Sequence, residues 1–464
     1  MSTKSAPIVS LQPPKDVSLS DIEAELSQIW QSYGMAGDNA GLPPATRATT
    51  FSLIVYEPEE TQQLLAALGV YKGPVDGIPG PQTEAALKEI QKKYGLSVTG
   101  TGTPETLQKL REEVAKRGGS GVSDTGNGAS ELAYNLSDQN PRIADAIALR
   151  NPCRIVALCP IAGADEGVKV QVSAYCPLQK QASNTLICCE YITLKGTAAA
   201  LERVGGLVSA LLIGDLPKFL WWKATPEPNN ELFKRLAAVC NSVVVDSSDF
   251  TETEANLLKL QELLKAGTPL ADLNWRRLSA WQELTAEAFD PPERRVALRE
   301  VDRVTVDYEK GNPAQALMYL GWLASRLNWH PTGLQEEAGD YDLKRIHFIT
   351  DDQRTVEAEL AGVPITDAGQ IPGDLMALRL TSTNVEADCC TVLCSETSGC
   401  MRMESGGGAQ SCRFQQVSSL ADQKAEILLS QQLQRWGSDP LYEESLAVTA
   451  EILALSNQYA SASK

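Results

Sequence analysis

The chain of 464 residues contains only two histidines, His330 and His347. This scarcity restricts the usual catalytic arrangements, because a Ser/His or Cys/His nucleophile pair would have to use one of them. His330 precedes a proline at an expected helix end, and His347 lies in the alternating strand pattern of residues 345–349. We therefore interpret both as structural residues and expect the protein not to be an enzyme.

Basic side chains are also fewer than acidic ones. The chain has 41 basic and 59 acidic side chains, a formal net charge of −18 at pH 7. Nucleic acids and anionic membrane surfaces are negatively charged and bind proteins through patches of basic side chains, so neither is expected as a partner. No stretch approaches the length of a membrane-spanning helix, and the opening MSTKSAPIVSLQPPKDVS lacks the apolar core of a signal peptide. We expect a cytoplasmic protein.

In that compartment most of the 11 cysteines should be reduced. Cys153, Cys159 and the vicinal Cys188 and Cys189 fit buried apolar positions. Five more cysteines gather in one β-rich segment: Cys389, Cys390, Cys394, Cys400 and Cys412. Their spacing does not match paired C-x2-C ligands and no histidine is near, so no metal is expected.

Cys394 and Cys400 enclose a short polar loop that ends in Gly399. A hairpin turn there could bring the two sulfurs together, since a disulfide needs Cα atoms within about 7 Å. Two interpretations stay open. The pair is either a regulatory dithiol or two buried, inert thiols.

Composition and turn signals divide the chain into five parts. They are an N-terminal extension with a short helix (1–59), a three-helix module (60–112), a Gly/Ser-rich flexible linker (113–130), an α/β subdomain (131–250), and an α+β subdomain with the cysteine-rich β segment and C-terminal helices (251–464). The expected fold class is mixed α/β, in which mixed sheets are covered by helices.

The 131–250 part alternates strand-like and helix-like runs, which is typical of an α/β sheet. The expected strands are 155–159, 168–175, 186–191, 219–222 and 243–246, and the expected helices are 196–212 and 230–239. Gly205-Gly206 lies inside a predicted helix rather than after a strand. The sequence therefore shows no dinucleotide fingerprint or phosphate loop, and no cofactor is expected.

Tryptophans mark two further places. The run from Leu207 to Lys223 predicts a helix, a turn and a short buried strand that ends in Trp221 and Trp222. Adjacent strand residues face opposite sides, so either both belong to the core or one lies at a surface where a partner docks. Trp275 belongs to an aromatic stripe at helical spacing, which is more often core than a binding groove.

Residues 60–112 resemble the peptidoglycan-binding-like domain family. The matching residues are Leu64, Leu65, Gly73, Asp76, Gly77, Gly80, Thr83, Ala86, Leu87, Gln91, Tyr94, Gly95, Leu96, Thr99 and Gly100. The resemblance implies a small three-helix fold. Such a module can be reused for docking or packing. A wall-associated binding protein is kept as an alternative function.

From Pro141 onward the chain resembles the glucose-6-phosphate dehydrogenase assembly protein (OpcA) family. The resemblance rests on four stretches: residues 151–155 (NPCRI), 214–222 (GDLPKFLWW), 242–247 (SVVVDS) and 272–277, where Arg277 fills the last position of a D-L-x-W-x-R pattern. A peptidoglycan-binding-like module ahead of this body resembles the cyanobacterial branch.

The OpcA resemblance implies a non-enzymatic activator that binds glucose-6-phosphate dehydrogenase and promotes its active oligomer in the oxidative pentose phosphate pathway. Trp221, Trp222, Trp275 and Arg277 are the candidate partner-binding residues. Thioredoxin-linked control through Cys394 and Cys400 would suit a photosynthetic cell. A thiol enzyme that uses Cys153 with His330 or His347 is the competing hypothesis from another class.

Overall fold

The computed structural model describes residues 8–33, 44–73, 75, 80–119, 151–177, 186–337, 339–364, 371–384, 390–395, 400–405, 414–419 and 424–462. The chain forms two compact units. The first comprises residues 1–245, 268–270 and 426–437, and the second comprises residues 246–267, 271–425 and 438–464. The predicted boundary at 250/251 thus lies five residues beyond the principal one.

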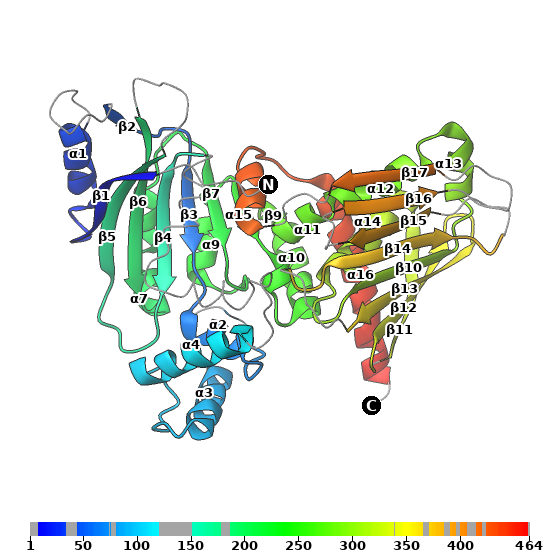
Figure 1. Cartoon of the computed structure of the whole chain (residues 1–464), viewed down its shortest axis with the longest axis horizontal. Helices are drawn as coiled ribbons and strands as arrows, with labels where there is room; N and C mark the ends of the chain where they lie inside the picture. Colours follow the sequence, from blue (N-terminus) through cyan, green and yellow to red (C-terminus); the bar gives the residue numbers. More distant parts are fainter. Residues whose placement is uncertain are drawn as a thin grey trace. The chain divides into compact units, whose positions relative to one another are not determined.

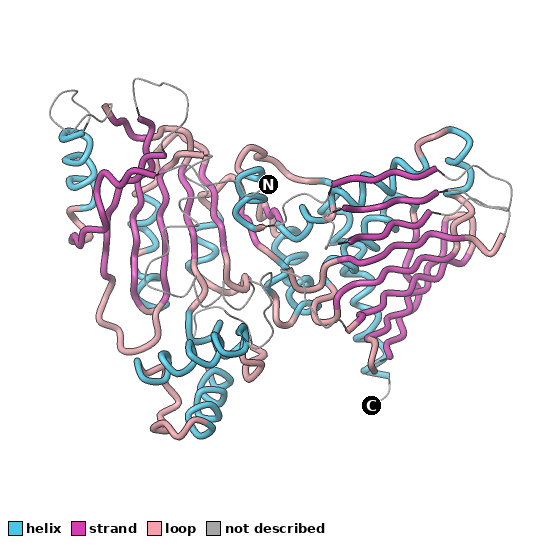
Figure 2. Tube along the Cα trace, in the orientation of Figure 1, coloured by secondary structure: helices cyan, strands magenta, loops and turns pink. Residues whose placement is uncertain are grey.

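The first unit is built on a sheet of nine described strands, in the order β1-β5-β6-β4-β3-β7-β8-β9 with β2 beside β6, and of β9 only the first residue, Leu270, belongs to this unit (Figures 1 and 2). Their bounds are β1 Ile8–Val17, β2 Ala45–Arg47, β3 Ser52–Tyr56, β4 Arg154–Pro160, β5 Lys169–Pro177, β6 Leu186–Gly196, β7 Lys218–Trp222, β8 Ser242–Val245 and β9 Leu270–Asp272. β3, β4, β6, β7 and β8 run parallel to one another. β5 runs antiparallel to β6, and β1 pairs antiparallel with β5 at the edge, so β1 has the direction of the parallel strands.

β3 is the central strand, because it pairs in parallel with β4 on one side and β7 on the other. Its residues 52–56 are all buried, as a strand covered on both faces requires. The expectation that residues 1–59 form an extension outside the body is wrong. The apolar run SLIVY supplies the middle of the sheet, and β1 extends the sheet at its edge.

Short helices cover this sheet: α1 Ile22–Tyr33, α7 Ala198–Arg203, α8 Gly205–Ala210, α9 Glu231–Ala237 and α15 Ala425–Gln432. The single helix predicted over 196–212 is divided at Val204 into α7 and α8. Gly205 begins α8 against Leu232 of α9, and a Cβ there would lie 2.9 Å from the Leu232 Cδ1. The helices can therefore approach closely at this point.

The three-helix module forms as predicted, with α2 Glu60–Ala67, α3 Pro81–Lys93 and α4 Pro104–Gly119. Its own apolar core includes Leu64, Leu87, Ile90 and Leu110. The Gln91 side chain organises the second turn, since its Oε1 accepts hydrogen bonds from the backbone N–H groups of Thr99 and Gly100, both at 2.9 Å. Asp76 and Gly77 of the resemblance lie outside the described residues, as does most of the predicted linker. The first part of that linker belongs to α4.

The second unit is an eight-stranded sheet, among the described residues, in the order β11-β12-β13-β10-β14-β15-β16-β17. The strands are β10 Arg303–Glu309, β11 Trp329–Glu337, β12 Asp342–Thr350, β13 Thr355–Val363, β14 Leu375–Thr381, β15 Cys390–Ser395, β16 Cys400–Ser405 and β17 Phe414–Ser419. The helices are η1 Ser247–Asp249, α10 Thr253–Lys265, α11 Leu273–Arg277, α12 Ser279–Phe289, α13 Pro292–Leu298, α14 Ala314–Leu327 and α16 Pro440–Ala462.

Helices α14 and α16 pack together beside this sheet (Figure 1). Gly321 allows the approach, because a Cβ there would collide with the carbonyl oxygen of Ser445. The Ser445 hydroxyl donates to the Met318 carbonyl at 2.6 Å, and the Thr449 hydroxyl donates to the Leu317 carbonyl at 3.1 Å. The predicted terminal helix is thus fixed into the core.

A polar linker after the three-helix module favours the hypothesis that the body folds without residues 1–112, but the position of β3 in the sheet argues against it. That deletion also removes four buried side chains of the central strand, Leu53 to Tyr56, each contributing about 1.5–3 kcal/mol. Since whole domains are stable by only about 5–15 kcal/mol, we predict that the 113–464 fragment does not fold cooperatively.

Circular dichroism during heating measures this loss. A chain that begins at residue 18 is the control, because it lacks only the edge strand β1 and should keep a cooperative transition. Parent-like unfolding of the 113–464 fragment would contradict the prediction.

Candidate functional site

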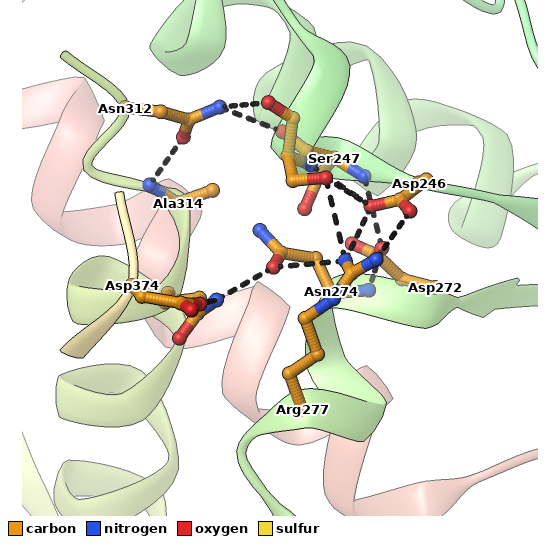
Figure 3. Close-up of polar contacts among 10 residues, drawn as sticks. Asp246, Ser247, Asp272, Asn274, Arg277, Asn312, Ala314 and Asp374 are labelled. Atoms are coloured by element: carbon orange, nitrogen blue, oxygen red, sulfur yellow. Dashed lines mark hydrogen bonds and ion pairs between the residues drawn. The ribbon is translucent and has the colours of Figure 1, made fainter. Parts of the chain in front are cut away.

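A cluster of buried polar side chains in the second unit surrounds a bidentate ion pair between Arg277 and Asp246 (Figure 3). Asp246 follows directly after the apolar strand β8, and Arg277 ends helix α11. The Arg277 Nη1 and Nη2 atoms donate to Asp246 Oδ1 and Oδ2 at 2.6 and 2.7 Å. The paired geometry is the strong form of a charge-assisted hydrogen bond.

Both carboxylates near Arg277 also begin helical turns. Asp246 Oδ1 accepts from the backbone N–H of Ser248 at 3.1 Å, at the start of η1. Asp272 Oδ1 accepts from the backbone N–H groups of Asn274 at 2.9 Å and Ser247 at 3.0 Å. Asp is a favoured N-cap because its side chain satisfies amides that lack a helical partner. The first residue of the D-L-x-W-x-R pattern is therefore a helix cap.

Amide side chains extend this network to α14 and β14. Asn274 Oδ1 accepts from Gln315 Nε2 at 2.9 Å, and Gln315 Nε2 also donates to Asp374 Oδ1 at 2.5 Å. Asn312 Nδ2 donates to the carbonyls of Ser247 and Ser248 at 3.0 and 2.9 Å. Four segments distant in sequence are thus joined by hydrogen bonds in each of which at least one side chain takes part (Figure 3).

The two carboxyl groups have different proton affinities. Burial alone would raise the pKa of Asp246, but the Arg277 guanidinium and the hydrogen bonds from Arg277 and Ser248 hold it below its ordinary value. Burial and the adjacent negative charge of Asp246 raise the pKa of Asp272 to about 6. Perturbed carboxyl groups of this kind occur both in active sites and in structural ion pairs.

Burial distinguishes between these two roles. Asp246, Asp272, Asn274 and Arg277 are 7%, 1%, 0% and 4% exposed. A substrate cannot reach groups this deep without the unit opening. We therefore interpret the network as a structural junction of the second unit.

The candidate partner-binding residues Trp275 and Arg277 belong to this junction. Trp275 is 5% exposed, and its Nε1 donates to Asp439 Oδ2 at 3.0 Å, just before α16. Its ring lies 5.7 Å from that of Tyr442. Neither Trp275 nor Arg277 presents a side chain at a surface, because both are committed to internal contacts.

Trp221 and Trp222 lie on β7 of the first unit. Trp222 stacks on Tyr56 of β3 at 3.8 Å between ring centroids and meets Phe233 of α9 edge-on. Trp221 and Trp222 are 2% and 1% exposed. Of the two alternatives for these tryptophans, the burial of both side chains supports the core interpretation rather than an exposed docking surface.

The first unit contains a second buried arginine, Arg154, from the NPCRI stretch. Its Nε donates to Glu190 Oε2 at 2.6 Å, and its Nη1 donates to Glu23 Oε1 at 2.6 Å and to the Leu211 carbonyl at 2.8 Å. Asn151 Nδ2 donates to Ser430 Oγ at 2.5 Å, which holds α15. This stretch therefore joins β4 and β6 to helices from both ends of the chain.

The cysteines differ from expectation in one respect. Cys176 of β5 and Cys188 of β6 form a disulfide, although Cys188 was expected to be a free core thiol. Cys153, Cys159 and Cys189 are free thiols. The sequence signal for this pair is one cysteine at each facing end of two adjacent strand patterns, 168–175 and 186–191.

Cys394 and Cys400 lie on the paired strands β15 and β16, in the hairpin-like arrangement expected. The register pairs Cys394 with Met401 and Ser395 with Cys400. The bond between the two cysteines stays a prediction. Cys389 and Cys412 lie outside the described residues.

The two histidines lie on strands of the second unit. His330 is the second residue of β11 rather than part of a helix end, and its Nε2 is 3.1 Å from Asp351 Oδ1 on an exposed surface. His347 lies on β12, as its strand pattern predicted. Within the described residues, no group of three or more His, Cys, Asp or Glu side chains is arranged to hold a metal ion, and no helix is long and apolar enough to cross a membrane.

Family models match most of the chain. Residues 144–262 match the glucose-6-phosphate dehydrogenase subunit N-terminal domain, and residues 268–446 match the corresponding C-terminal domain. The "Putative OxPP cycle protein OpcA" of Nostoc punctiforme is 69% identical over 98% of this chain and 97% of its own length. The chain belongs to the OpcA family.

Two further OpcA relatives cover the chain equally well. The relative from a Synechocystis species is 55% identical over 98% of this chain and 95% of its own length. The relative from Synechococcus elongatus is 51% identical over 97% of this chain and 98% of its own length. Residues 57–110 match a peptidoglycan binding domain, which confirms that resemblance. A solved biliverdin reductase from Synechocystis is 10% identical with a TM-score of 0.37, over 68% of this chain and 95% of its own, too distant to bear on function.

The Arg277–Asp246 pair generates a stability prediction. Removing one partner of a buried pair leaves an uncompensated charge, so Arg277→Ala should cost about 3–5 kcal/mol. The Asp246→Ala/Arg277→Ala double variant should lose clearly less than the sum of the single losses. Urea unfolding of the four proteins gives the coupling energy, and additive losses would contradict the assignment.

Proposed function

We propose that this chain is a non-enzymatic activator that binds glucose-6-phosphate dehydrogenase and promotes its active oligomer in the oxidative pentose phosphate pathway. The observation that carries the proposal is the match of two dehydrogenase-subunit family models to residues 144–262 and 268–446. Full-length relatives named as proteins of the OxPP cycle support it. Location in the cytoplasm, where that pathway operates, is part of the proposal.

The chemistry of the buried groups is consistent with a binding protein. Cys153, the candidate nucleophile of the competing thiol-enzyme hypothesis, is fully buried, and burial raises its pKa well above the ordinary value. A reactive cysteine instead needs a stabilised thiolate that solvent and substrate can reach. The perturbed carboxyl groups around Arg277 are likewise occupied by internal hydrogen bonds.

An activator of this kind needs only differential affinity. If the chain binds the active oligomer more tightly than the inactive form, mass action shifts the population toward the active form. About 1.4 kcal/mol of preference changes the equilibrium tenfold. The activator itself needs no catalytic group.

We further propose that thioredoxin-linked reduction of Cys394 and Cys400 controls this activity. In the register of β15 and β16 the two cysteines are one position out of alignment. Facing residues of an antiparallel pair share a side of the sheet and neighbouring residues alternate, so a bond between them requires the hairpin end to rearrange. Oxidation would then change the surface that this hairpin offers to the dehydrogenase.

The activator proposal predicts a kinetic effect. Adding the chain to the purified dehydrogenase of the same cell should lower the apparent Michaelis constant for glucose 6-phosphate or raise the fraction of active oligomer. Steady-state kinetics and analytical ultracentrifugation measure these two quantities. If neither changes at saturating concentration of the chain, the proposal fails.

The redox proposal predicts that oxidation weakens activation and that a reduced dithiol carrier restores it. Cys394→Ser and Cys400→Ser should each abolish this response, whereas Cys188→Ser, which removes the other disulfide, should keep it. Mass spectrometry of the oxidised, alkylated protein identifies the bond. A response that survives in both Cys394→Ser and Cys400→Ser would place the switch elsewhere.

A further inference from the structure

The strand order of the first unit is that of a nucleotide-binding sheet. Its parallel strands lie in the order β6-β4-β3-β7-β8. The chain runs outward from β3 through β4 to β6, and then returns to the other side of β3 with β7 and β8. Where a doubly wound sheet reverses direction in this way, a crevice opens outside the carboxyl ends of the two central strands, and nucleotides bind there.

The connection that follows β3 would receive the phosphates in such a site. Nucleotide-binding sheets place a glycine-rich turn there, which leads the pyrophosphate to the N-terminus of a helix. Here the connection reads Glu57-Pro58-Glu59 and enters α2 at Glu60 without any glycine. Glu57 is paired with Lys223, and the negative charge of Glu59 would repel a phosphate rather than attract it.

Glu59 fills the helix N-terminus itself. Its Oε2 accepts from the backbone N–H of Gln62 at 2.8 Å, and its Oε1 accepts from the Thr61 hydroxyl at 2.7 Å. The side chain is only 5% exposed. A buried carboxylate thus makes the contacts that a bound phosphate makes at other helix N-termini.

The rest of the module covers the ends of the neighbouring strands. The Val75 carbonyl accepts from the backbone N–H of Thr225, which follows β7, at 3.1 Å. Gly102 lies against the loop after β4, where an added Cβ would be 3.3 Å from the Ala162 Cβ and 2.8 Å from the Thr61 hydroxyl oxygen. Lys223, next after β7, pairs with Glu57. In Figure 1 helices α2 and α4 lie at the arrowhead ends of β3 and β4.

We propose that the three-helix module is an internal plug of a nucleotide crevice, in which the Glu59 carboxylate stands where a dinucleotide phosphate would bind. The first unit then has the strand order of a dinucleotide-binding domain but does not take up a nicotinamide dinucleotide. The module acts in packing rather than in binding a cell wall.

The experiment uses the full-length chain and two probes, NADPH and inorganic pyrophosphate. The Glu59→Ser variant keeps a helix-capping residue but removes the carboxylate. Glu105→Ser is the matched control, because Glu105 is an exposed glutamate in the first turn of α4 and its loss changes the net charge equally. Fluorescence titration measures NADPH binding, and thermal unfolding measures the response to pyrophosphate.

We expect no NADPH binding by the unsubstituted chain. We expect pyrophosphate to raise the unfolding midpoint of Glu59→Ser by about 2–4 °C more than that of the unsubstituted chain or Glu105→Ser, the shift that roughly 1 kcal/mol of ligand binding produces. Glu59→Gln, which keeps the length and an acceptor oxygen, replaces Glu59→Ser if the latter does not fold.

Two results would overturn the proposal. One is saturable NADPH binding by the unsubstituted chain. The other is an equal pyrophosphate response in the Glu59 variant and Glu105→Ser. The first measurement needs no variant, so the proposal can fail even if both Glu59 variants are unstable.

Discussion

A buried guanidinium must be neutralised, and each compact unit of this chain is arranged around one. In the second unit Arg277 is held by Asp246, and in the first Arg154 is held by Glu190 and Glu23. A buried charge without a partner costs several kcal/mol, so these contacts restrict the elements that carry them to one arrangement. The positions of the strand ends, helix caps and distant helices that carry the partner carboxylates are set by these contacts.

The stretches that mark the family are largely those that satisfy this requirement. The NPCRI stretch supplies Arg154 and Asn151, and the D-L-x-W-x-R stretch supplies Asp272, Trp275 and Arg277. All five side chains contact other parts of their own unit. A substitution at one of these five residues would thus change the stability or shape of the chain itself.

Local patterns predicted most of the elements of the body. The apolar runs 155–159 and 243–246 were predicted as strands and form most of β4 and β8. A short continuous apolar run bounded by turn signals is typical of a strand that is buried on both faces. The run at 52–56 has the same apolar pattern, but it lies in the region that composition and turn signals separate from the body. Its neighbours are far away in sequence, and single-sequence patterns carry no information about such pairing.

In the candidate site, too, local sequence predicted the residues but not their non-local contacts. The resemblance selected Trp275 and Arg277, but their burial depends on Asp439 and Asp246, which no local spacing connects with them. The Cys176–Cys188 bond depends on the register of β5 and β6, which is also non-local. The sequence was enough to select the residues of interest. Their exposure to solvent and their contacts with other side chains could be known only from the three-dimensional structure.

The central position of β3 has a consequence for the chain during its synthesis. The ribosome releases β3 early, but its neighbours β4 and β7 begin only at Arg154 and Lys218. Until then an apolar strand with two unpaired edges precedes a module that can already form local helical contacts, and such edges invite association with other chains. The nascent protein therefore passes through an aggregation-prone interval, during which chaperone binding near residues 52–56 would be most useful.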